Sequence, residues 1–216
     1  QLGAAGNVNE ALDIWQNQVL PIVGSAGQEA DAALIRVKIA WLLARLDKDD
    51  EAFERLHAAI DVLDQLGEQR AAAIARGAVA DILKKRQQYD EALTIMRNQV
   101  LPVCEALNDR PGIALAKLDI AHLLLAQGEV TPQKESLVLE YHSDAWQIVN
   151  ELTLPDSIAA VGWWWGQVLA GIGETDAAIT VLEQAAAAQE FLGHAEAAQR
   201  TRAFIKKLQE QRDART

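Results

Sequence analysis

The sequence has few of the residues and segments that mark several classes of protein. It contains one cysteine, Cys104, among 216 residues, so no internal disulfide is available, which fits a reducing compartment. We therefore expect a cytoplasmic protein. No run approaches the roughly 18 apolar residues of a membrane span, and the N-terminus has neither the basic nor the apolar region of a secretory signal. The sequence predicts no membrane partner.

Basic residues, aromatic residues and prolines are also scarce. Twenty Lys and Arg face 31 Asp and Glu, a net charge of −11 that repels a phosphate backbone, so we expect no nucleic-acid partner. Aromatic residues make up 5% of the chain, and there are five prolines. Ala and Leu recur throughout while β-branched residues seldom cluster, a composition that favours helices over strands.

Motifs that carry catalysis or bind metals are missing. The histidines lie far apart with no H-E-x-x-H motif, and Cys104 has no second cysteine to complete a zinc site. There is no glycine-rich phosphate loop and no G-x-S-x-G motif. The acidic stretch 47–51 lacks the glycine and the distal glutamate of a calcium loop. We therefore predict no catalytic residues, no cofactor and no metal, and a protein that is not an enzyme.

The chain repeats itself at a regular interval. Asn17–Pro21 and Asn98–Pro102 share the five residues N-Q-V-L-P at a distance of 81 positions, which is two intervals. A second series of small residues is spaced by 41, 40, 44 and 42 positions, and a fixed spacing of this size predicts a solenoid. The members of this series are Ala11, Ala52, Ala92, Ser136 and Ala178.

Within each interval a small residue precedes a leucine by three positions. The pairs are Ala40 and Leu43, Ala80 and Leu83, Ala121 and Leu124, and Gly166 and Leu169. This spacing places both residues on one face of a helix, and a small side chain there allows the paired helix to approach closely. The interval therefore predicts two packed helices per repeat.

These positions resemble the tetratricopeptide repeat (TPR) family, whose pattern contains L-G-x2-Y followed by A-x3-F. Ile39-Ala40-x2-Leu43 is an example of the first part and Ala11-x3-Trp15 of the second, and the match covers nearly the whole chain. The period is longer than is usual in the family. It is similar to the long-repeat variants, with roughly 40 residues per repeat, of kinesin light chains and bacterial signalling proteins.

The resemblance implies an all-α fold, a right-handed solenoid of antiparallel helix pairs with about ten helices. We expect one domain over 1–216, with a half repeat, four helix pairs and a capping helix at 1–29, 30–69, 70–109, 110–155, 156–193 and 194–216. The helices are predicted near 8–24, 30–46, 50–66, 70–87, 90–107, 111–127, 134–152, 157–171, 175–192 and 194–212. Because the chain begins with Gln1 inside a repeat, we expect it to be the C-terminal part of a larger protein.

Several residues are predicted to shape the helix ends and axes. Asn9, Asp50, Asp90 and Asp176 lie where N-caps are expected, and Gly67, Gly128, Gly173 and Gly193 lie where helices should end. Pro21 and Pro102 fall well inside their helices, where a proline removes a hydrogen bond and bends the axis. Their recurrence at one repeat position predicts a role in repeat curvature.

In the TPR family the first helix of each pair lines a concave groove, and the resemblance implies a protein or peptide partner there. Trp163, Trp164 and Trp165 cannot all face one way on a helix, so we expect Trp165 in the core and the other two at the interface. An amphipathic helix or an extended peptide would suit such a groove. The predicted partner-binding residues are Val37, Trp41, Asp81, Lys84, Leu118, His122, Leu125, Trp163, Trp164 and Gln167.

Three alternatives remain open from the sequence. The same side chains could pack against neighbouring helices instead of lining an open groove. They could also mediate self-association into a homo-oligomer, since solenoid surfaces build oligomers as well. As a third interpretation, the chain is a peptide-sensing regulatory domain of a bacterial signalling protein.

Overall fold

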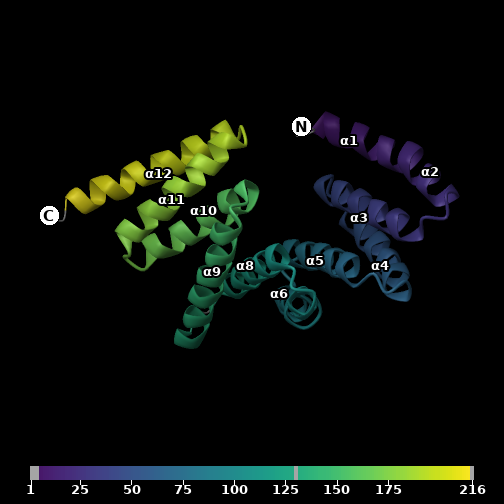
Figure 1. The fold of residues 1–216 in the computed structure, drawn as a ribbon, viewed down its shortest axis with the longest axis horizontal. Helices are drawn as coiled ribbons and strands as arrows, with labels where there is room; N and C mark the ends of the chain where they lie inside the picture. The colour runs from purple at the N-terminus through teal and green to yellow at the C-terminus, as the bar shows by residue number, and fades with distance from the viewer. Residues whose placement is uncertain (1–4, 129–130, 215–216) are drawn as a thin grey trace. The chain divides into compact units, whose positions relative to one another are not determined.

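The computed structural model describes residues 5–128 and 131–214, and every regular element within these ranges is a helix (Figure 1). The contacts within the chain fall into two compact units, Gln1–Leu107 and Asn108–Thr216. Each unit is a series of helices joined by short turns, and consecutive helices pack side by side. The all-α prediction is confirmed, whereas the single domain stays a prediction.

Unit 1 contains five continuous helices within its described residues. The first is made of α1 (Ala5–Asp13), η1 (Ile14–Val19) and α2 (Leu20–Ser25), and the last of α6 (Tyr89–Ile95), η2 (Met96–Val100) and α7 (Leu101–Ala106). Between them lie α3 (Glu29–Arg45), α4 (Asp49–Gln65) and α5 (Gln69–Lys85). Helices α3 and α5 are the first helices of successive pairs, and they contact one another as well as α4.

The described part of unit 2 contains five helices: α8 (Arg110–Ala126), α9 (Pro132–Leu152), α10 (Pro155–Gly171), α11 (Thr175–Phe191) and α12 (Ala195–Asp213). The described helices of both units follow the predicted ranges to within a few positions. The small residues Ala40, Ala80, Ala121 and Gly166 are all buried where helices meet. The predicted close approach of paired helices is thereby confirmed.

A left-handed residue follows nearly every helix at a regular interval. These residues have positive φ angles and recur every 20 or 21 positions, apart from one interval of 25 before Thr153. The four glycines predicted to end helices are among them, but four other members are not glycine and were not predicted. The series is Gly27, Asp47, Gly67, Gln87, Asn108, Gly128, Thr153, Gly173 and Gly193.

The predicted N-caps are wrong at the described helix starts. The caps of α4, α6 and α11 are Lys48, Gln88 and Glu174, and none of them accepts a hydrogen bond through its side chain. The turns are so short that the cap directly follows the left-handed residue, which places the predicted aspartates inside the first helical turn. There their charge favours the positive end of the helix dipole. Asn9 lies within α1, away from a cap position.

The two N-Q-V-L-P segments form π-helical turns. The amides of Leu20 and Leu101 donate to the carbonyl oxygens of Trp15 and Met96, five positions back in each case. Proline has no amide hydrogen and its ring collides with the carbonyl four positions earlier, so the preceding turn widens. The identical segments therefore produce the same local widening in the first and last helices of unit 1.

Thr153 offers a test of the strain at the helix ends. Its φ is 51°, and a β-branched side chain in the left-handed region costs about 1–2 kcal/mol relative to glycine. We expect Thr153→Gly to raise the melting temperature by a few degrees, since about 1 kcal/mol shifts it by roughly 2–4 °C in a chain of this size. The matched control is Gly173→Thr, which should lower it. A decrease for Thr153→Gly would contradict the assignment.

Candidate functional site

A hollow of about 390 Å³ lies between α3 and α5 in unit 1. Trp41 and Asp81, two of the predicted partner-binding residues, both line it. Side chains three, four and seven positions apart share one face of a helix, which explains why these side chains meet here. The full lining is Trp41, Ala44 and Arg45 from α3 and Ala78, Asp81, Ile82 and Lys85 from α5.

The hollow exists because a large ring on α3 faces a small residue on α5. Trp41 remains 46% exposed, a high value for the largest side chain. Ala78 contributes only a methyl group at the opposite wall, so the space beside the indole is not filled. An exposed aromatic in a concave, partly apolar setting is typical of contact sites.

The equivalent place in unit 2 is filled by a side chain. Trp164 on α10 holds the repeat position of Ala78, two positions before the small residue, and His122 on α8 holds that of Trp41. The Trp164 and His122 rings meet edge to face with centroids 4.5 Å apart. The two places differ at both facing positions: Trp41 faces Ala78 across an open hollow in unit 1, whereas His122 packs on Trp164 in unit 2.

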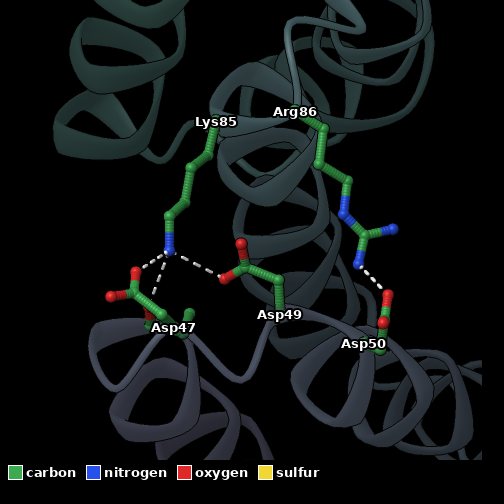
Figure 2. Close-up of polar contacts among 6 residues, drawn as sticks. Asp47, Asp49, Asp50, Lys85 and Arg86 are labelled. Carbon is green, nitrogen blue, oxygen red and sulfur yellow. Dashed lines mark hydrogen bonds and ion pairs between the residues drawn. The ribbon is translucent and has the colours of Figure 1, made fainter.

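Two of the charges that line the hollow are held by neighbouring side chains. Lys85 Nζ donates to Asp47 Oδ1 at 2.6 Å, to Asp49 Oδ1 at 3.0 Å and to the Ala44 carbonyl at 3.1 Å (Figure 2). These bonds raise the pKa of Lys85, and they lower the pKa of the Asp47 carboxyl. Asp81 accepts from Lys84 at 3.2 Å. Ion pairing thus ties α5 to the turn before α4.

The third charged residue of the lining, Arg45, differs from Lys85 and Asp81 in its surroundings. Its side chain is exposed in the last turn of α3. Across residues 5–128 and 131–214, its guanidinium has neither an ion-pair nor a hydrogen-bond partner. Arg45 is therefore the cation of the hollow that remains open to a ligand.

Val37 and Leu118 are core residues, which corrects their prediction as groove residues. Val37 is 1% exposed, and Leu118 packs in a cluster with Ala145 and Val149. Both lie three positions before the small residue, and that offset points the side chain toward the paired helix. Neither residue can contact a partner directly.

The other predicted residues of unit 2 divide into packed and exposed groups. Trp163 is half-buried, with its ring edge-on to Phe204 at 6.0 Å, and its carbonyl accepts from Gln167 Nε2 at 3.2 Å. Leu125 and Trp164 remain 42% and 44% exposed. Of the three consecutive tryptophans, Trp164 is the exposed one. The interface role predicted for Trp163 stays a prediction.

Sequence reasoning missed Ala78, Arg45 and Lys85. Arg45 and Lys85 lie four positions after Trp41 and Asp81, so helical spacing alone could have added them to the predicted set. Ala78 carried no signal, because its importance lies in the absence of a side chain. The role of Ala78 is recognised only by comparison with Trp164, which lies at the equivalent repeat position.

His142 is a buried imidazole on α9 with one free nitrogen. The residue is 0% exposed, Nδ1 donates to the Val138 carbonyl at 2.9 Å, and Nε2 has no hydrogen-bond partner among the described residues. Its ring stacks on Trp165 with centroids 6.1 Å apart. Burial lowers the pKa of His142 below its ordinary 6.5, so the folded protein holds this ring neutral.

This lowered pKa predicts a loss of stability in mild acid. Below about pH 6.5 the unfolded chain binds a proton at this histidine that the folded chain does not, at up to about 1.4 kcal/mol per pH unit. We expect the melting temperature to fall between pH 7.5 and pH 5.5. Arg110 and Arg202 lower the pKa of Glu151 and Glu190 below 4.5, so these carboxylates stay ionised in this window.

His142→Leu should make the melting temperature less dependent on pH over the same interval. His194→Leu is the matched control, because His194 is exposed and its replacement should leave the wild-type decrease unchanged. Thermal unfolding followed by circular dichroism at both pH values measures the effect. An identical decrease in His142→Leu and wild type would show that another group is responsible.

The described part of the chain contains neither a candidate metal site nor a candidate membrane-spanning helix. Its residues include no group of three or more His, Cys, Asp or Glu side chains that could hold a metal ion. None of the described helices is both long and apolar enough to cross a membrane. The hollow between α3 and α5 is the candidate functional site because two of the predicted partner-binding residues, Trp41 and Asp81, line it.

The sequence matches no protein-family model, and no curated protein is similar enough to match it. Solved structures do match. A Rap protein in complex with Competence and Sporulation Factor is 14% identical, with a TM-score of 0.76 over 98% of this chain. The match spans 60% of that Rap chain. The whole Rap protein is therefore longer than the part that this chain resembles.

Two further structures show the same architecture. BtubC from P. vanneervenii is 11% identical with a TM-score of 0.64, over 97% of this chain and 91% of its own. A Podosopora anserina kinesin light chain with nearly identical TPR-like repeats is 14% identical with a TM-score of 0.56, over 82% of this chain and 94% of its own. The chain therefore has the TPR-like helical-repeat solenoid fold, as the repeat pattern predicts.

Proposed function

We propose that the protein is a non-catalytic interaction module that binds a peptide segment of another protein in the hollow between α3 and α5. The observation that carries this proposal is Trp41, which is 46% exposed beside a space that the equivalent place in unit 2 fills with Trp164. An apolar side chain of the partner would occupy the same space and cover the indole. Tryptophans in such positions are frequent binding hot spots.

The size of the hollow supports a side-chain anchor. Its volume of about 390 Å³ lies at the lower end of the roughly 300–1,000 Å³ of ligand pockets. One large apolar side chain and part of its neighbour would fill it. The segment on either side would then lie along the exposed faces of α3 and α5, where polar contacts set its register.

Similarity to the Rap structure adds motivation at the level of the fold. That protein was solved in complex with Competence and Sporulation Factor, and this chain shares its helical-repeat architecture. Under this proposal the chain is a peptide-sensing or scaffolding part of a protein whose activity, if it has one, is supplied elsewhere. The partner is identified by its chemistry, an apolar anchor within an otherwise flexible segment.

Selection from a displayed library of short random peptides tests the proposal. We expect the wild-type protein to enrich peptides with a recurring large apolar residue. Trp41→Ala should weaken their binding at least about tenfold, because truncation of a hot-spot residue costs about 2 kcal/mol or more. Fluorescence anisotropy of labelled synthetic peptides measures the affinity, and circular dichroism checks that the helices persist.

Trp164→Ala is the matched control for this selection, since it removes an indole of similar exposure from unit 2. It should bind the enriched peptides as wild type does. The proposal fails if no peptide is enriched, or if the enriched peptides bind Trp41→Ala unchanged. Sedimentation at several concentrations covers self-association: an oligomer that dissociates on Trp41→Ala would mean that a second copy occupies the hollow.

A further inference from the structure

We infer, resting on the proposed function, that the bound segment carries a carboxylate close to its apolar anchor and that Arg45 binds this carboxylate. The specificity of the site would then be an apolar residue with an Asp or Glu nearby. Three observations lead to this: which charges of the hollow are already paired, how charge is distributed over the helices of unit 1, and how Arg45 lies relative to Trp41.

The paired charges leave one candidate for recognition. Lys85 is held by three oxygen atoms, from the end of α3, the following turn and the start of α4 (Figure 2), and Asp81 accepts from Lys84. A ligand that engaged Lys85 would have to break existing bonds, because all three of its N–H donors are used. Asp81 is an anion and cannot bind a carboxylate. Arg45 has no such partner within the described chain, so a carboxylate at the hollow can bind its guanidinium without displacing another group.

Charge is distributed unevenly over the helices of unit 1. The helices that line the hollow, α3 and α5, are net basic although the protein carries a net charge of −11. Helix α4, which packs against both, is net acidic. Helices α3 and α5 hold Arg36, Lys38, Arg45, Arg70, Arg76, Lys84 and Lys85 against Glu29, Asp31 and Asp81, and α4 holds Arg55 against Asp49, Asp50, Glu51, Glu54, Asp61 and Asp64.

This distribution favours an anionic segment at the hollow. Several of the basic side chains are paired with acidic ones, for example Arg76 with Asp64 at 2.6 Å, so the excess is local and modest. Complementary charge of this kind increases association rates and suppresses wrong partners more than it increases affinity. An acidic segment would be repelled by α4 and attracted by the α3 and α5 faces.

Arg45 is placed for a carboxylate next to the anchor. Trp41 and Arg45 are four positions apart on α3, so their side chains neighbour each other with Cβ atoms about 5–6 Å apart. An anchor beside the indole therefore brings the next few residues of the segment within reach of the guanidinium. The planar guanidinium can donate two parallel hydrogen bonds to a carboxylate, which a lysine cannot do.

The test uses the peptides enriched from the displayed library, synthesised with blocked termini so that only side chains supply carboxylates. We expect Asp or Glu within about four positions of the anchor, and at least a tenfold loss of affinity when that residue becomes Gln or Asn. Arg45→Glu should produce a similar loss for the acidic peptides. It should also improve the binding of peptides in which the acidic residue is replaced by Lys.

Arg36→Glu is the matched control, because it makes the same charge change on α3 at a residue outside the lining of the hollow. It should leave affinity within about twofold of wild type. Equal affinity for acidic and amide peptides, or equal losses in Arg45→Glu and Arg36→Glu, would overturn the inference while Trp41-dependent binding still stands. Absence of Trp41-dependent binding would instead overturn the proposed function, and the inference with it.

Discussion

Ala78→Trp should reduce peptide binding to unit 1 by at least about 100-fold, or about 2.7 kcal/mol. At the equivalent repeat position of unit 2, Trp164 packs edge to face on His122 and stays 44% exposed. Ala78 is 4% exposed, so an indole there would have to turn outward over Trp41. The new ring would cover Trp41 and occupy the space of about 390 Å³ that the partner's anchor requires. Binding would be lost through steric exclusion, with the helices intact.

Anisotropy titration with the selected peptides measures this loss, and the melting temperature reports on the fold. Ala58→Trp is the matched control, since Ala58 is exposed on α4 and away from the hollow. That variant adds the same ring to the surface and should keep wild-type affinity. If Ala78→Trp binds the peptides normally and remains folded, the site lies elsewhere on the chain.

Gly166→Ala should destabilise the protein by about 1–3 kcal/mol, although Ala is normally the better helix former. A Cβ atom on Gly166 would lie 2.4 Å from Leu182 Cγ and 2.6 Å from Leu182 Cδ2. Leu182 is fully buried in α11, and the contact falls on its Cγ atom and not only on the ends of its side chain, so it cannot be relieved by a small rotation of the methyl groups. The helices α10 and α11 would have to separate.

Gly77→Ala provides the opposite expectation. Nothing lies within 4 Å of a Cβ atom at Gly77 in α5, so this change should stabilise by about 0.5–1 kcal/mol through the helix propensity alone. Urea titrations followed by circular dichroism give both free energies. The packing argument fails if both glycine replacements change stability in the same direction by similar amounts.

The fold could be predicted from the sequence because the residues that recur in each repeat are the ones that pack between its helices. Ala40, Ala80 and Ala121 are small where helices meet, and Leu43 and Leu83 are apolar on the same faces, so the repeated residues alone locate the helix pairs. The regularity of a repeat fold gives each observation several independent copies. This redundancy is absent for features that occur once.

The helix ends were predicted less well for a physical reason. Glycine marks a left-handed residue because it lacks a Cβ atom, but Gln87 and Thr153 adopt the same conformation at a cost that the surrounding structure sustains. The caps were displaced for a related reason. The turns are short, so Lys48 and Gln88 occupy the cap positions regardless of their weak capping ability.

The candidate site was predictable only in part. Trp41 and Asp81 followed from the family resemblance, since both lie on first helices at groove positions, and both line the hollow. The prediction was wrong for Val37 and Leu118. The groove face and the core face of a helix differ by a small rotation about its axis, and sequence spacing alone does not resolve that rotation. Ala78 could not be found by searching for functional side chains, because it contributes free volume.

The regular placement of left-handed residues limits how the length of this chain can change. The left-handed residues mark the turns between helices, and successive turns are one helix apart. Adding or removing a whole helix pair therefore leaves every later helix as the first or second helix of its pair, as it was before. A change of one helix would exchange the first and second helices of every later pair and bring their buried apolar faces into water. Viable length variants should therefore differ by whole helix pairs, and duplications of single helices should aggregate.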